Sequence, residues 1–583
     1  MIVRYLREHT SPPVFVTSAV LAVAFVSWGV LSPASLGSVA DSVNAWITDT
    51  LGWLYIFSAT GFLVFVIVLM ASRYGRVKLG PSDSTPEYGT VSWFAMLFTA
   101  GMGIGLVFYA VSEPISHFTA PPTGDGSSPE AARNAMLYTF FHWGLHPWAI
   151  YIVLGLSLGY FAFRKGLPLR PAAALYPILK DRINGWPGYL VDVIAVFGTL
   201  FGLATSLGIG AQQVAAGLDA VFGWENTTTL QVVLIAAITA IAITSLMLGL
   251  DKGIRRLALI NLWLALALML FVFFFGPTRD LLNSLASNIG TYVQEVPGLS
   301  FETFTDGGNG TAAEWQSSWT LFYWGWWISW SPFVGMFLAR ISYGRTIRNF
   351  VAGCLFAPVG ASMVWLTVFG DSALELVQAD PADPLAEAAP ETAIYVLLAQ
   401  LPVPEFVVLL ASLLTIFVVV LFFATSSDSG SLVVDILTNG GDPNPRWQQR
   451  LFWAVLEGVI AAVLLTAGAV AGTDALSALQ TASIVAGLPL GIVLVLMAVG
   501  LTRALRDERF VVALPVEPSP AQGLRESSRR STSSSENGEG ITGSHTEPET
   551  HDPLLSETAV AEFATTRAAP PDSGGERSGR DQD

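Results

Sequence analysis

Long apolar runs alternate with short polar segments from residue 14 to residue 502 of this chain. An α-helix needs about 20 apolar residues to cross a bilayer. Runs near this length recur at residues 14–31, 51–70, 93–110, 136–161, 190–215, 232–250, 257–275, 321–341, 351–369, 406–436, 451–469 and 482–501. The pattern predicts an all-α integral membrane protein with twelve transmembrane helices.

Lysine and arginine gather in every second connection between these runs. The basic connections lie around residues 73–78, 164–182, 252–256, 340–348, 446–450 and 503–506. The other connections hold only Arg133 and Arg279 among many acidic residues. Basic connections mark the cytoplasmic side, so we expect a multi-pass protein of the plasma (inner) membrane with both termini in the cytoplasm. Residues 1–13 form a polar segment, and the run after it is too long for a signal peptide.

Two polar segments need a separate interpretation. Apolar residues between about 278 and 300 have near-helical spacing, which predicts an amphipathic helix lying along the outer membrane surface. The alternative is an ordinary polar loop. Residues 503–583 are rich in Ser, Pro, Gly, Glu and Arg, so they predict a cytoplasmic, largely disordered tail. A small basic cluster in this tail either touches anionic membrane lipid or is solvated.

Composition narrows the function. The chain is 52% hydrophobic and 13% charged, whereas a soluble protein carries roughly 25% charged residues. The net charge of −16 argues against a nucleic-acid partner. The single cysteine, Cys354, excludes a disulfide framework and a thiolate metal site. The spans show no His/Asp metal cluster and no nucleophile beside a base, so we expect neither an enzyme nor a cofactor. A channel would show a repeated polar ring, and none is visible.

Three glycines at alternate positions interrupt the third run. Gly101, Gly103 and Gly105 are poor helix formers, each costing about 1 kcal/mol against alanine. A helix opened within lipid must satisfy its freed carbonyl groups, and a buried cation would do so. Close packing of helices through small residues is the alternative.

Aromatic residues crowd the eighth run, directly before Ser331 and Pro332. They cover about 18 Å of helix at 1.5 Å per residue, which exceeds one interfacial belt, so part of the row should face the protein interior. A trimethylammonium group has no N–H and is held by ring faces, at about 0.5 to 2 kcal/mol per contact. His142 and His146 in the fourth run are interpreted as packed and neutral, with proton carriers or metal ligands as alternatives. The row is Trp319, Tyr323, Trp324, Trp326, Trp327 and Trp330.

The tenth run carries adjacent hydroxyl groups, Thr425 and Ser426, near Asp428. Polar groups deep in an apolar run are functional candidates, and uncharged oxygens suit a weakly held sodium ion. Hydroxyl groups bonded to their own helix are the alternative, which we favour for Ser427 and Ser429.

At these residues the chain resembles the betaine/choline/carnitine transporter family, and within it the sodium-coupled glycine betaine carriers. The similarity is carried by residues 326–342, by the glycine run and by Ser112-Glu113-Pro114. It implies a LeuT-like inverted repeat of five plus five helices, at about 91–276 and 318–502, behind two extra helices. It also implies a homotrimer, a role in osmoprotection, and substrate bound near the midplane at broken helices, here the glycine run and Ser331-Pro332.

The resemblance also assigns site residues. Trp143, Trp148 and Tyr151 would form an aromatic box, with Trp324, Trp326, Trp327 and Trp330 along the substrate path. The backbone of Gly101, Met102 and Gly103, with Ser206, would receive a carboxylate. One sodium ion would bind Thr99, Met102, Phe422, Thr425 and Ser426. A second sodium site would use Thr199 and Phe333, but Leu203 stands where these carriers have another threonine, and Thr205 is the alternative.

We therefore predict import of glycine betaine, coupled to sodium, by alternating access. Gly105 is similar to betaine carriers, whereas choline-type members tend to place an acidic group there. The alternative is a carrier of choline, carnitine or another onium compound that uses protons or exchanges solutes.

Overall fold

A computed structural model describes residues 6, 8–101, 103–248, 254–304, 311–471 and 475–508 of the 583-residue chain. These ranges are helical and contain no β-strand, apart from an isolated antiparallel bridge between Lys78 and Thr346. Ten helical segments among them are long and apolar enough to cross a membrane. The predicted class, an all-α integral membrane protein, is confirmed, while twelve spans and the inverted repeat stay predictions.

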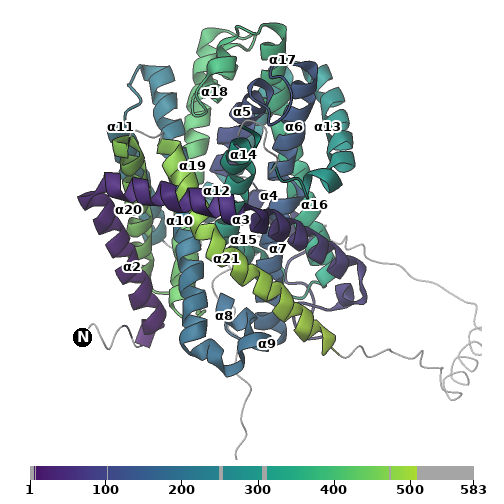
Figure 1. Cartoon of the computed structure of the whole chain (residues 1–583), viewed down its shortest axis with the longest axis vertical. Coiled ribbons are helices and arrows are strands. Elements are labelled where there is room, and N and C mark those ends of the chain that lie inside the picture. Colours follow the sequence, from purple (N-terminus) through teal and green to yellow (C-terminus); the bar gives the residue numbers. More distant parts are fainter. Residues whose placement is uncertain are drawn as a thin grey trace, which may run out of the picture.

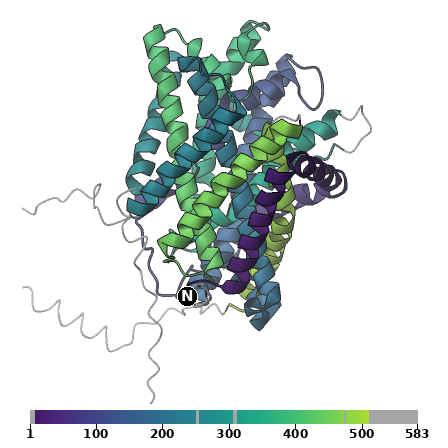
Figure 2. The same cartoon turned by 90° about the vertical axis from the view of Figure 1, so that its left-hand side faces the viewer.

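The long helices run mostly along the long axis of the molecule (Figures 1 and 2). Helix α10 packs against α15, α19 and α21, and α15 also packs against α7. The helices, in chain order, are α2 (Pro12–Leu31), α3 (Pro33–Ala71), α4 (Thr90–Gly101), α5 (Ile104–Thr119), α6 (Pro129–Trp143), α7 (Leu145–Gly159), α8 (Pro171–Ala174), α9 (Tyr176–Leu179), α10 (Trp186–Phe222), α11 (Thr228–Leu248), α12 (Ile254–Phe275), α13 (Thr278–Leu299), α14 (Thr311–Gln316), α15 (Phe322–Arg340), α16 (Ile347–Leu366), α17 (Ser372–Ala379), α18 (Ala393–Ala399), α19 (Glu405–Thr438), α20 (Trp447–Ala471) and α21 (Ala475–Arg506).

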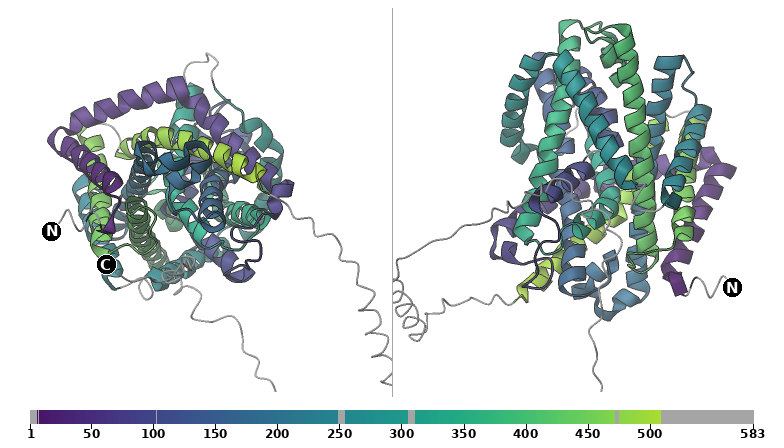
Figure 3. Two further views of the ribbon diagram at one scale, coloured as in Figure 1. Left: turned by 90° about the horizontal axis from the view of Figure 1, so that it is seen from below. Right: turned by 180° about the vertical axis from the view of Figure 1, so that it is seen from behind.

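Helix α3 is much longer than the predicted span at 51–70. It has 39 residues and starts at Pro33, a residue type well suited to the first turn of a helix. It crosses the outside of the bundle, over α20 and α21 (Figure 1 and Figure 3, left). Trp46, Trp53 and Phe57 on α3 are more than half exposed, which suits a surface in contact with lipid.

The eighth predicted span differs from expectation at Pro332. Helix α15 continues through this proline to Arg340, so the predicted Ser331-Pro332 break is wrong. The Ser331 hydroxyl donates to the carbonyl of Ile328 at 2.6 Å, within the turn that proline disturbs. Instead, the irregular turn is a π-helical segment at Ser317–Leu321, before α15 begins.

The predicted outer helix is present as α13, whereas its position along the membrane surface stays a prediction. It packs against α6 with Leu281 and Tyr292 buried. The Tyr292 hydroxyl accepts a hydrogen bond from the backbone N–H of Leu145 at 2.9 Å. Helix α13 therefore supports the junction between α6 and α7, where the aromatic residues of the site are found. The predicted tail lies outside the described residues from 509 onward.

Two pairs of glycines hold α15 against its neighbours. A Cβ on Gly155 of α7 would lie 2.8 Å from the carbonyl oxygen of Gly335. A Cβ on Gly487 of α21 would lie 2.8 Å from the carbonyl oxygen of Gly325. Backbones that approach this closely leave no room for a methyl group. The helix that carries the aromatic row is thus fixed from two sides.

We expect Gly335→Ala to lower the unfolding temperature. The new methyl would lie 2.7 Å from Leu154 Cδ2 and 3.0 Å from the Gly155 nitrogen. Overpacking of this kind costs about 1 to 3 kcal/mol, more than the roughly 1 kcal/mol that alanine gains in helix propensity. Thermal unfolding followed by size-exclusion fluorescence measures the shift. The control is Gly61→Ala on α3, where nothing lies within 4 Å of the new Cβ; equal unfolding temperatures for the two variants would contradict the clash.

Among the described residues, the predicted basic connections around 73–78, 164–182, 340–348, 446–450 and 503–506 lie toward one end of the bundle, near α8 and α9 (Figure 1). The Arg164 guanidinium donates to the Gly80 carbonyl at 2.9 Å, and Arg348 donates to the Met70 carbonyl at 3.0 Å. At the same end, the Glu508 carboxylate after α21 accepts hydrogen bonds from Arg164, from Lys165 at 2.8 Å and from the Tyr160 hydroxyl at 2.6 Å. These contacts tie the end of α21 to the end of α7.

Replacing Glu508 with glutamine should loosen this tie. The hydrogen bonds from Arg164 hold the pKa of Glu508 at about 2. A carboxyl pKa below its unfolded value, about 4.3, stabilises the fold above that value, and the stabilisation is lost as the pH falls toward 2. We therefore expect backbone amides near residues 160–165 and 504–508 to exchange about two- to fivefold faster in Glu508→Gln, since an ion pair near the protein surface contributes at most about 1 kcal/mol.

Hydrogen–deuterium exchange at pH 7 measures this effect, with Glu405→Gln at the start of α19 as the matched control. Wild-type exchange protection at these amides should not change between pH 6 and pH 8, because Glu508 stays ionised there. A fall in protection within that range would contradict the assignment.

Candidate functional site

The third predicted span is broken at its glycines. Helix α4 ends at Gly101, α5 begins at Ile104, and Gly103 between them has extended backbone angles of φ −152° and ψ 176°. This confirms the predicted opening of the helix. The first N–H groups of α5 have no partner within their own helix and carry partial positive charge.

Indole rings pack directly on the opened backbone. A Cβ on Gly105 would lie 2.5 Å from Trp326 and 2.9 Å from Trp143, and a Cβ on Gly103 would lie 3.6 Å from Trp330. Any side chain at residue 105 would therefore displace two indole rings. Glycine is required here by this close approach.

These residues border a pocket at the break of the third span. It contains about 460 Å³ of space between atoms, a figure that includes the open space at its mouth. Helices α5, α6, α7, α15 and α16 contribute to its walls. The lining residues are Gly103, Gly105, Leu106, Trp143, Pro147, Trp148, Tyr151, Trp326, Trp327, Trp330 and Ser362.

Four aromatic rings of the pocket meet at steep angles. The Trp143 and Trp327 ring centroids are 4.9 Å apart with 69° between the planes, and those of Trp148 and Tyr151 are 5.5 Å apart at 86°. Tyr151 and Trp327 are 6.3 Å apart at 78°. Rings set edge to face in this way turn several faces toward one volume. We call Trp143, Trp148, Tyr151 and Trp327 the aromatic cage.

The indole N–H groups of α15 are bonded to backbone outside the pocket. Trp327 donates to the carbonyl of His142 at 2.9 Å. Trp326 and Trp330 both donate to the carbonyl of Gly202, at 3.3 and 3.1 Å. Buried N–H groups need such partners, and their bonding fixes the rings before any ligand arrives. What these rings offer a ligand is therefore mainly their π faces.

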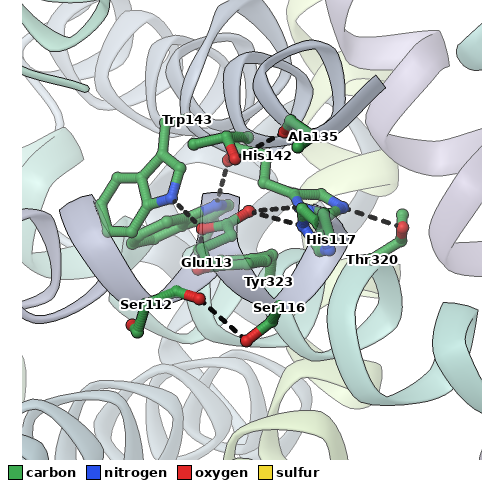
Figure 4. A network of polar contacts seen from close by, with 11 residues as sticks. Ser112, Glu113, Ser116, His117, Ala135, His142, Trp143, Thr320 and Tyr323 are labelled. Atoms are coloured by element: carbon green, nitrogen blue, oxygen red, sulfur yellow. Dashed lines mark hydrogen bonds and ion pairs between the residues drawn. The ribbon is translucent and has the colours of Figure 1, made fainter. Parts of the chain in front are cut away.

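Behind the cage lies a buried polar network centred on Glu113 of α5 (Figure 4). One carboxylate oxygen accepts the indole N–H of Trp143 at 2.7 Å and the hydroxyl of Tyr323. The other contacts His142 Nδ1 at 2.7 Å and His117 Nε2 at 3.2 Å. Glu113 and both histidines are fully buried. The network therefore joins α5, α6 and α15 directly beside the cage.

The same network includes a possible metal-binding arrangement that contradicts the expectation of no such cluster in the spans. One ligand atom each from Glu113, His117 and His142 lies within 4.8 Å of the others. Sequence reasoning missed it because His142 is on a different helix from the other two residues. The short contacts have the lengths of hydrogen bonds: His142 Nδ1 lies 2.7 Å from a Glu113 carboxylate oxygen, and its Nε2 lies 2.9 Å from the Thr320 hydroxyl.

Two predicted substrate residues do not line the pocket. Trp324 stacks on His146, with ring centroids 5.3 Å apart, and contacts Phe141 edge-on. The Ser206 hydroxyl donates to the carbonyl of Gly202 in its own helix, at 3.2 Å. Met102 lies outside the described residues, and for Gly101 only its place at the end of α4 is described.

The predicted first sodium site is described in part. Met102 and the side chain of Thr99 lie outside the description. On α19, the Thr425 hydroxyl donates to the carbonyl of Leu421 at 2.8 Å, Ser426 is half-buried and Phe422 is buried. A Cβ on Gly210 would lie 3.2 Å from Ile104 and 3.3 Å from Phe423, so this part of α19 is close to the start of α5. The sodium site stays a prediction.

Around the predicted second sodium site, the Thr199 hydroxyl donates to the carbonyl of Ala195 at 2.8 Å. Leu203 fills the space beside Gly430, where a Cβ would come within 2.3 Å of it. The Thr205 hydroxyl lies 2.8 Å from the hydroxyl of Ser483 on α21 and so faces that helix. Phe333 packs against Trp330, with centroids 5.4 Å apart.

Sequence reasoning did not assign three of the lining residues: Leu106, Pro147 and Ser362. Pro147 stood out only as a proline beside Trp148. Ser362 lies within the ninth apolar run, and nothing in the spacing of that run marks it. A buried serine on α16 enters the site only through the packing of α16 beside α7.

Comparison with known proteins gives a consistent result. The model of the BCCT family, the betaine/carnitine/choline transporters, matches residues 13–510. The chain is 44% identical over 505 residues to the glycine betaine transporter OpuD of Bacillus subtilis (strain 168), covering 86% of this chain and 96% of that protein. It is 47% identical over 500 residues to an uncharacterized transporter of Mycobacterium tuberculosis, covering 85% and 82%.

A further relative is the high-affinity choline transport protein of Escherichia coli (strain K12), 43% identical over 516 residues, with 86% of this chain and 73% of that protein covered. Among solved structures, a Na+-coupled sialic acid symporter gives a TM-score of 0.42 at 14% identity, covering 76% of this chain and 86% of that chain. That similarity is too distant to bear on the site.

Proposed function

This chain belongs to the betaine/carnitine/choline transporter family, and from this premise we propose that it imports glycine betaine by sodium-coupled symport. Like its relatives, it is a multi-pass membrane transporter. It is not an enzyme. The relatives transport betaine in one case and choline in another, so the choice of substrate rests on the pocket.

The aromatic cage is the observation that carries the proposal. A quaternary ammonium group bears a full positive charge and no N–H, so it cannot use hydrogen-bond acceptors. Ring faces attract it, with about 0.5 to 2 kcal/mol per desolvated contact. The cage offers Trp143, Trp148, Tyr151 and Trp327 around one volume, with the indole N–H groups of Trp143 and Trp327 bonded elsewhere.

The opposite end of betaine is a carboxylate, which the start of α5 can receive. Gly103 and Gly105 line the pocket, and the N–H groups of a helix N-terminus favour an anion. Among the described residues that line the pocket, none has an acidic side chain. Betaine brings its own negative charge to this site, whereas choline does not. Transport of choline, carnitine or another onium compound, with protons or by exchange, is the alternative, and the choline relative supports it.

Sodium coupling follows if both ligands hold the broken third span. A sodium ion bound between α4 and α19 and a carboxylate bound at the start of α5 would each complete the site for the other. The two ligands together would then stabilise an occluded state in alternating access. Basic connections at one end of the bundle support cytoplasmic termini. A homotrimer and osmoprotection belong to the same proposal, on the family resemblance.

Reconstitution into liposomes tests the proposal. Betaine, choline and carnitine are offered to the purified protein under an imposed sodium gradient, an imposed proton gradient, or neither. We expect betaine to accumulate only with the inward sodium gradient. Faster transport of choline than of betaine would reject the substrate, and accumulation driven by protons without sodium would reject the coupling ion.

A further inference from the structure

Glu113 lies in a position that its hydrogen bonds alone do not explain. It is fully buried on α5, nine residues after the first residue of that helix, or about 14 Å along it. The pocket lies at the start of the same helix. The ring of Trp143 stands between the Glu113 carboxylate and the pocket, because Trp143 lines the pocket and its indole N–H points to the carboxylate.

Donor groups occupy both oxygens of this carboxylate. The Trp143 indole N–H and the Tyr323 hydroxyl donate to one oxygen, and ring nitrogens of His142 and His117 lie 2.7 and 3.2 Å from the other. An ionised carboxylate is the species that suits such a set, because charge-assisted hydrogen bonds are stronger than neutral ones. The residues around Glu113 are thus arranged for a negative charge.

Among the described residues, no Lys or Arg side chain forms an ion pair with the Glu113 carboxylate. The ion pairs of that part of the chain give Glu113 only the two histidines, His117 and His142. A buried charge is costly unless it is paired. A cation held in the cage would supply the missing partner, separated from the carboxylate by one indole ring.

The hydrogen bond to Trp143 also acts on the ring itself. An indole N–H that donates to a carboxylate makes its π system more electron-rich, which strengthens attraction of a cation at the ring face. Tyr323, the second ring bonded to Glu113, stacks on Trp327 with centroids 5.6 Å apart at 24°. Trp327 in turn meets Trp143 edge to face at 4.9 Å. The Glu113 carboxylate therefore acts on two cage rings, on Trp143 directly and on Trp327 through Tyr323.

We propose that Glu113 is the cation-selecting and positioning residue of the transporter: its carboxylate fixes Trp143 and Tyr323 and gives the aromatic cage a negative field that distinguishes a quaternary ammonium group from a neutral group of the same shape. This inference rests on the proposed function. It adds a residue that does not touch the substrate and acts through the rings.

The test compares glycine betaine with 3,3-dimethylbutanoate, in which a carbon atom replaces the charged nitrogen and the carboxylate is kept. Both ligands are titrated into purified protein in nanodiscs with saturating sodium, by isothermal calorimetry and by competition with radiolabelled betaine. The readout is the ratio of the two dissociation constants. A residue that only supports the fold would weaken both ligands together and leave the ratio unchanged.

For Glu113→Gln we expect the preference for betaine over 3,3-dimethylbutanoate to fall at least about tenfold, because the charge is lost while the size is kept. Glu113→Asp keeps the charge but shortens the reach to Trp143. It should weaken both ligands and retain most of the preference. Trp143→Phe keeps a ring but removes the donated N–H, and should lower the preference by about two- to fivefold.

Trp143→Phe and Tyr323→Phe leave the carboxylate in place, so they carry the test if Glu113→Gln fails to give monodisperse protein. An unchanged ratio in Glu113→Gln, or in both phenylalanine variants if that protein is lost, would overturn the inference. Wild-type protein that binds no betaine would instead overturn the proposed function, so the two failures are distinguishable.

Discussion

Replacing Trp327 with leucine should reduce sodium-driven betaine uptake to less than one-tenth of the wild-type rate and leave the protein in the membrane. Trp327 offers a face to the pocket between Trp143 and Tyr151. A desolvated cation–π contact contributes about 2 kcal/mol, which is a factor of roughly 30 in affinity. The variant also loses the hydrogen bond to the carbonyl of His142, which joins α15 to the end of α6.

Uptake into proteoliposomes, normalised to the amount of inserted protein, measures this effect. Trp263→Leu on α12 is the matched control, because that tryptophan is 66% exposed and faces away from the bundle. Trp327→Phe keeps an aromatic face and should retain an intermediate rate. Unchanged uptake in Trp327→Leu would show that the cage does not hold the substrate.

Apolar runs predicted most of the helices, and the departures have physical causes. Residues 33–50 contain Asp41, Asp49 and several serines, so their hydropathy ends the predicted span, yet the helix is continuous because α20 and α21 support it. Pro332 predicts a break from the missing N–H. In the structure α15 is continuous across that residue, with close glycine contacts to α21 before it and to α7 after it.

The site, too, could be predicted from the sequence only in part. Spacing brings Trp326, Trp327 and Trp330 close together on one helix, but the row surrounds that helix, so spacing cannot tell which side faces a pocket. The family resemblance placed Trp324 among the predicted substrate residues, although it packs on His146. Glu113 was visible only within a motif, because its partners come from helices far away in the sequence.

Ser426→Ala should raise the sodium concentration that gives half-maximal uptake by about tenfold or more. The sodium site we propose takes two hydroxyl oxygens from α19, those of Thr425 and Ser426. A contact with a full charge contributes about 1.5 to 3 kcal/mol, and alanine supplies no replacement oxygen. Thr425→Ala should have a similar effect, because a hydroxyl that donates to the carbonyl of Leu421 still offers its oxygen lone pairs to the ion.

Sodium titration of betaine uptake measures the shift, with Ser429→Ala on the same helix as the control. The Hill coefficient for sodium should be close to 1, since Leu203 packs beside Gly430 and provides no oxygen for a second ion. If Ser426→Ala and Ser429→Ala give the same sodium dependence as the wild type, the Ser426 hydroxyl does not bind the ion. A Hill coefficient near 2 would instead show a second sodium site that does not use a hydroxyl at residue 203. The first site, on α19, would be unaffected by that result.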